Sequence, residues 1–133
     1  MTRVIFGDVV ELVIAYLAEL APDLIVGTEF KKPTSKPTVT INRSGGPQSL
    51  RVADQAYVSF DVWAPSTWNG LADAHDVAQT VRSIVGSMTG AVVNGTPIYR
   101  VSELAGPARL PSPDRETDRW TFALAVTFRG QST

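Results

Sequence analysis

The segment between residues 119 and 129 alternates between large apolar side chains and small ones, and this pattern constrains the fold more than any other. Such alternation predicts a β-strand with one face in a hydrophobic core, because successive strand side chains point to opposite sides. The large face contains Trp120, Phe122, Leu124, Val126 and Phe128. The small face contains Thr121, Ala123, Ala125 and Thr127. Because alanine is a poor choice for a merely solvated strand, the small face is a candidate contact surface for another subunit.

Two segments have helical periodicity instead. Asp8, with Glu11 three residues later, predicts the start of a helix that runs to about Ala21, where Pro22 prevents its continuation. From Ser66 or Thr67 the pattern changes to a second helical one, with an apolar stripe from Ala74 to Met88, and this helix is predicted to end near Gly90. Further strands are predicted at 24–28, 38–43, 56–63 and 98–104. The sequence therefore predicts an α+β fold in the order α-β-β-β-α-β-β, with two helices on one face of a mainly antiparallel sheet of about five strands.

The chain has 133 residues, which suits a single domain spanning residues 1–133. Residues 106–118 contain three prolines and charges of both signs, and we interpret them as a flexible loop. Its charged side chains are candidate partner contacts that become ordered on docking: Arg109, Asp114, Arg115, Glu116 and Asp118. Trp68, in a segment rich in Pro, Ser and Asn, is a further candidate interface residue.

Residues that support catalysis are scarce. The sequence has no cysteine and one histidine, and it contains neither a nucleophile elbow nor a phosphate-binding glycine loop. Asp73 and Asp76 have a spacing that could share a metal, but His75 and Asp76 are adjacent and should diverge around a helix. We therefore expect no enzymatic activity, no cofactor and no metal.

Binding to nucleic acid or membrane also has little support. The formal net charge is -1, whereas dedicated nucleic-acid binders are strongly basic. The basic cluster of Lys31, Lys32 and Lys36 predicts at most weak contacts with a nucleic-acid backbone. The longest apolar stretch is too short to cross a bilayer of about 30 Å, so we expect no membrane partner. No export signal is evident, and a cytoplasmic product is expected.

Four segments together resemble the tail terminator proteins of long-tailed, siphovirus-type bacteriophages, particularly those of actinobacterial phages. The first is the helix sequence VVELVIAYL at residues 9–17, and the second is PTVTINRSGG at residues 37–46. The third is VSFDVWA at residues 58–64, and the fourth is the closing strand from RWTF at 119–122 to FRG at 128–130. The resemblance covers most of the chain, and its motifs are structural.

This resemblance implies a non-enzymatic virion protein that caps the tail tube as a hexameric ring, ends tail polymerisation and forms the head-tail joining surface. Its implied partners are further copies of itself, the major tail tube protein and a head completion or connector protein. Its implied location is the head-proximal end of the tail in the virion, and the host cytoplasm during assembly. DNA passes through such rings, which makes Lys31, Lys32 and Lys36 candidate channel residues. The alternatives are a head completion or connector (neck) protein and a non-specific DNA-binding module.

Overall fold

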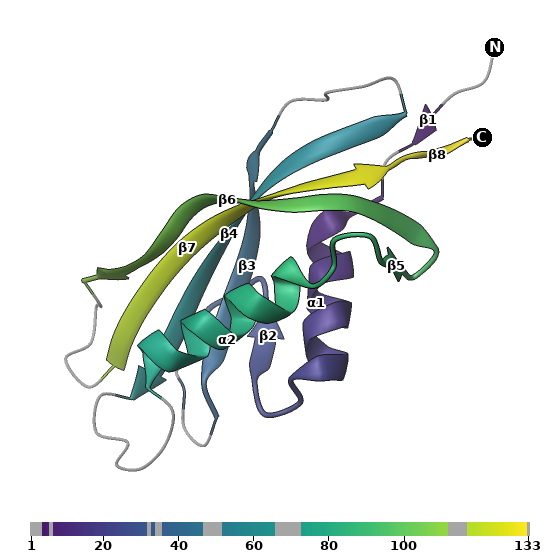
Figure 1. Cartoon of the computed structure of the whole chain (residues 1–133). Coiled ribbons are helices and arrows are strands. Elements are labelled where there is room, and N and C mark those ends of the chain that lie inside the picture. Colours follow the sequence, from purple (N-terminus) through teal and green to yellow (C-terminus); the bar gives the residue numbers. More distant parts are fainter. Residues whose placement is uncertain are drawn as a thin grey trace.

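A computed structural model of the chain describes residues 4–5, 7–31, 33, 36–46, 52–65, 73–111 and 117–132 (Figure 1). Helices and strands make up most of the described chain. Their bounds are β1 (Val4–Ile5), α1 (Val9–Leu20), β2 (Ile25–Gly27), β3 (Thr38–Gly45), β4 (Ala53–Pro65), α2 (Ala74–Gly86), β5 (Val92–Val93), β6 (Thr96–Leu110), β7 (Thr117–Arg129) and β8 (Gln131–Ser132).

Six strands form one curled sheet in the order β2-β3-β4-β7-β6-β5, and β1 pairs with β8 in a separate two-stranded ribbon. Every neighbouring pair in the large sheet is antiparallel except β2 and β3, which are parallel. Both helices lie on the same side of this sheet (Figure 1). Helix α1 packs against β2 and β3, whereas α2 packs against β4, β6 and β7. The predicted α+β class with two helices and a mainly antiparallel sheet is confirmed.

The predicted number and order of strands are wrong. The sheet has six strands instead of about five, because β5 adds a short strand between α2 and β6. The complete chain order is β-α-β-β-β-α-β-β-β-β. The added strands β1, β5 and β8 have two residues each, so they are too short to produce a recognisable alternation of side chains.

The described parts of the segment expected to be a loop are mostly strand. Residues 106–110 belong to β6 and residues 117–118 to β7, and Pro111 follows β6 directly. Pairing with β7 holds the proline- and glycine-containing end of β6 in extended form, including Ala108↔Thr121 and Leu110↔Arg119. Proline is compatible with this position because no strand of the described residues pairs with β6 on its other side there.

The start of α1 is as predicted. The Asp8 carboxylate accepts hydrogen bonds from the backbone N–H groups of Val10 at 3.0 Å and Glu11 at 3.4 Å. These bonds satisfy two donors that have no partner within the helix. Asp73 has the same role at α2, where it accepts from the N–H of Asp76 at 2.9 Å.

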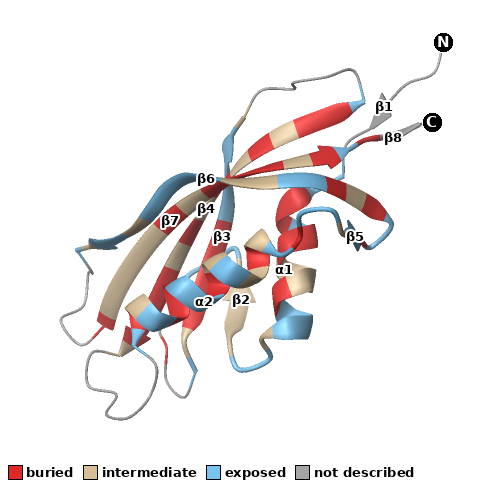
Figure 2. Cartoon of the chain, in the orientation of Figure 1, coloured by how far each residue is buried: buried red, intermediate tan, exposed pale blue. Residues whose placement is uncertain are grey.

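The core lies between the helices and the large face of β7. Phe122, Leu124, Val126 and Phe128 are buried, as predicted, whereas Trp120 at the end of the row is only partly buried. The Phe60 ring of β4 stacks on Phe122 with 4.6 Å between ring centroids and 6° between ring planes. Red segments in Figure 2 mark this core along β4, β7 and the inner sides of both helices.

Candidate assembly interface

The sheet face opposite the helices contains the small residues of β7. Cross-strand pairing sets Thr121, Ala123 and Ala125 beside Asp61, Ser59 and Tyr57 of β4, respectively. Ala125 is buried, while Thr121, Ala123 and Thr127 are partly exposed. Thr121 also donates a hydrogen bond from its hydroxyl to the Phe60 carbonyl oxygen, at 3.0 Å. The predicted contact surface is therefore less accessible at Ala125 than the alternation alone indicates.

One end of this face is covered by an aromatic and ionic cluster. Arg119 donates two hydrogen bonds to Asp61 Oδ1, at 3.1 and 3.0 Å, and its guanidinium lies 4.9 Å from the Trp63 ring centroid. Phe30, from the segment after β2, packs on the same ring with 4.4 Å between centroids. Trp63 is buried and also donates to Thr40 Oγ1 at 3.5 Å. These contacts hold the segment after β2 against the sheet.

Sequence reasoning did not identify this cluster. Asp61, Trp63 and Arg119 do share one face according to their alternation, but their proximity depends on the register Trp63↔Arg119 and Asp61↔Thr121. Phe30 lies about thirty residues away along the chain, in a segment with no periodic pattern. Part of the cluster could have been found from Trp63 at the end of a predicted strand, because Asp61 lies two residues earlier and so on the same face.

Two of the predicted charged contact residues, Arg109 and Asp118, lie near the ends of β6 and β7 where the two strands pair. Arg109 and Asp118 come together in an ion pair of 3.1 Å. Arg109 is the more exposed partner, so this pair presents a cation to solvent. Asp114, Arg115 and Glu116, together with Trp68 in another segment, lie outside the described residues. Figure 2 shows that the end of β6 at Arg109 is exposed.

The predicted basic cluster is spread along the connection between β2 and β3. Lys31 is exposed and lines a pocket beside β2, whereas the Lys36 ammonium donates to the Pro22 carbonyl oxygen at 3.3 Å. Lys32 lies outside the described residues. Neither Lys31 nor Lys36 forms an ion pair with the described part of the chain. Both therefore retain a positive charge that is not neutralised by an adjacent carboxylate.

The only described group of metal-ligating type is formed by Asp73, His75 and Asp76, whose ligand atoms all lie within 4.8 Å of one another. The expectation that His75 and Asp76 diverge is wrong, because His75 Nδ1 lies 3.7 Å from Asp76 Oδ1. Two members have evident structural roles. Asp73 caps α2, and the His75 ring packs on Trp120 with 4.6 Å between centroids.

The sheet has two different open edges. Within the described ranges, β2 pairs with β3 alone on one side, and on the other side β5 pairs with β6 at Thr96 and Pro97 alone. Backbone groups at such edges are available for pairing with another chain. No helix in the described ranges is long and apolar enough to cross a membrane.

Comparisons with protein-family models and with curated proteins found no match to this chain. The functional inference therefore depends on the sequence resemblance and on the surfaces described above.

Proposed function

We propose that this protein is a structural component of a siphovirus-type phage tail that caps the tail tube as a hexameric ring. In this role it ends tail polymerisation and provides the surface that joins the filled head. The proposal is supported by the resemblance of four sequence segments to tail terminators. The structural observation that supports it best is the pair of non-equivalent open edges on one sheet.

A closed ring of identical copies requires two different, complementary surfaces on each copy, because each subunit contacts its neighbours head to tail. The β2 edge and the β6 edge differ in length, direction of pairing and side-chain content. They lie on opposite sides of the sheet, separated by β3, β4 and β7. This arrangement suits a heterologous contact and does not suit a two-fold symmetric one.

The two axial surfaces of the proposed ring would contact the tail tube and the head connector. The paired ends of β6 and β7, with Arg109 and Asp118, are our candidate for one axial contact, because they carry these charges and project beyond the helices (Figure 1). Lys31 and Lys36 are candidates for contact with the DNA that passes through the ring. Such contact would be with phosphates and would weaken steeply with salt.

The proposal is tested by electron microscopy of purified virions and tails, with an epitope tag on this protein. We expect the tag as a ring at the head-proximal end of the tail, and also on tails that lack heads. A tag found on tailless heads and absent from free tails would instead identify a head completion or connector protein. A tag absent from the virion would refute both roles.

A further inference from the structure

Two bulges in β6 expose large apolar side chains. In the register with β7, Ile98↔Phe128 is followed by Arg100↔Thr127, so Tyr99 has no partner. Glu103↔Leu124 is likewise followed by Ala105↔Ala123, which leaves out Leu104. Tyr99 is 46% exposed and Leu104 is 47% exposed. Because a bulge changes the direction in which side chains point, the backbone conformation of β6 itself exposes these two residues.

The edge of β6 is covered by the chain up to Val101 and is open for pairing beyond it. Residues 90 and 91 bond to the backbone of Ile98, and the Thr89 hydroxyl accepts the Val101 N–H at 3.0 Å. From residue 102 to residue 110 the described chain supplies no strand on this side. Arg100 is exposed and forms no ion pair within the described ranges, whereas Glu103 is neutralised by Arg82. Residues 99–104, which we call the bulged edge, therefore present two exposed apolar side chains, Tyr99 and Leu104, together with the Arg100 cation.

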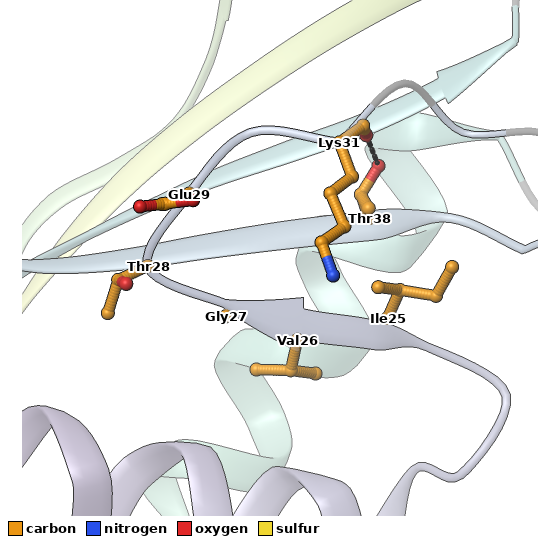
Figure 3. A pocket seen from close by; sticks show the side chains of 7 residues that line it. All are labelled: Ile25, Val26, Gly27, Thr28, Glu29, Lys31 and Thr38. Carbon is orange, nitrogen blue, oxygen red and sulfur yellow. Dashed lines mark hydrogen bonds between the residues drawn. The ribbon is translucent and has the colours of Figure 1, made fainter.

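The opposite edge of the sheet is hollowed. A pocket of about 200 Å³ lies beside β2 and is lined by Ile25, Val26, Gly27, Thr28, Glu29, Lys31 and Thr38 (Figure 3). This volume is below the ~300–1,000 Å³ of small-molecule sites, and it suits a single inserted side chain. We call it the β2 pocket.

In the described chain, the β2 pocket also borders backbone groups that face away from β3, and its lining includes one carboxylate, Glu29, and one ammonium, Lys31. Ile25 donates its N–H to the Pro37 carbonyl oxygen at 2.9 Å, so the next residue, Val26, directs its backbone groups away from β3. In Figure 3 the Lys31 side chain extends toward Ile25, and Glu29 points elsewhere. Glu29 is exposed and has no ion pair in the described part of the chain.

We propose that the bulged edge of one copy docks on the β2 edge of the next copy, with Tyr99 in the β2 pocket and Arg100 paired with Glu29. This inference rests on the proposed ring and specifies the contact that builds it. One chain supplies both halves of the match: an exposed apolar side chain beside a cation, and a pocket at whose rim Glu29 points away from Lys31. The two halves lie at opposite edges, so they meet only between copies and generate a head-to-tail series.

Charge reversal tests the pairing in the full chain. We expect Arg100→Glu and Glu29→Arg each to weaken self-association at least tenfold in analytical ultracentrifugation, because each places like charges in contact. Combining them should restore association. Arg129→Glu is the matched control, since Arg129 is exposed, has no described ion pair and lies on β7. Equal effects of Arg100→Glu and Arg129→Glu, or no restoration in the double variant, would overturn the pairing.

Cross-linking also tests the contact if the free chain is largely monomeric in dilute solution, because it traps weak contacts at high protein concentration. The sequence has no cysteine, so Glu29→Cys and Arg100→Cys introduce the only thiols. A bis-maleimide is used because a Glu–Arg pair separates its Cα atoms by more than the ~6 Å of a disulfide. We expect the double variant to give a ladder beyond the dimer, whereas each single variant stops at the dimer. The control pair is Glu29→Cys with Arg129→Cys.

The outcomes separate this inference from the ring proposal when the same samples are viewed by negative-stain electron microscopy. A cross-linked ladder together with rings supports both the contact and the ring. A ladder with open chains in place of rings supports the contact and counts against the ring. Rings without a ladder above the control pair overturn the contact and leave the ring proposal intact. The absence of both ladder and rings overturns the contact.

Discussion

The Phe60–Phe122 stack should be the most sensitive point of the core, and Phe122→Ala tests this expectation. Phe122 is 1% exposed and its ring lies 4.6 Å from that of Phe60, so truncation leaves a cavity between the sheet and α2. Phe→Ala changes at such sites reduce the free energy of unfolding by about 3–5 kcal/mol. That loss is a large fraction of the ~5–15 kcal/mol typical of a domain.

Phe30→Ala is the matched control, because the same atoms are removed from a side chain that is 48% exposed. Because about half of this side chain is buried, its removal should reduce the free energy of unfolding by about 1 kcal/mol. Urea titration followed by circular dichroism measures both variants without relying on tryptophan fluorescence, which Phe30 would affect through Trp63. The free energy of unfolding falls by about 2 kcal/mol per molar urea, so Phe122→Ala should lower the urea midpoint by ~2 M and Phe30→Ala by ~0.5 M. Equal losses of unfolding free energy in the two variants would refute the view that the core lies on the helix side of the sheet.

Three further changes probe local structure by the same titration. Asp8→Ala removes the cap of α1 and should cost about 1 kcal/mol; no loss would mean that the two N–H groups find water equally well. Gly46→Ala should destabilise more than Gly45→Ala, since both have positive φ but only at Gly46 would a Cβ collide with the backbone of β4. Arg43→Met should cost about 2 kcal/mol, because Asp54 is buried and loses two donors at 3.0 and 3.3 Å. An added Asp54→Asn should recover part of that loss, and an equal or greater loss in the double variant would contradict the pairing.

Local signals in the sequence predicted the elements that depend on neighbouring residues. Asp8 marked the start of α1, and alternation identified the buried face of β7 from Phe122 to Phe128. Both depend on side chains within one segment, whose spacing determines a helix cap or a strand face.

Some features that depend on distant partners were not predicted. The second half of β6 contains Gly106 and Pro107 and was interpreted as a loop, yet pairing with β7 extends it to Leu110. The bulges at Tyr99 and Leu104 interrupt the alternation that would have shown a longer strand. For the same reason the candidate site was incomplete: the small face of β7 was visible in the sequence, whereas the bulged edge and the β2 pocket were not.

The position of β7 in the sheet also governs how the chain can fold during synthesis. This strand lies between β4 and β6, although it follows both in the sequence. About fifty residues separate the end of β4 from the start of β7, and ribosomes require several seconds for that length at about 5–20 residues per second. During this interval β4 has no partner on one side and its phenylalanine at position 60 lacks the ring on which it stacks. The nascent chain should therefore recruit chaperones, and it completes its sheet only after residue 129 has left the ribosome.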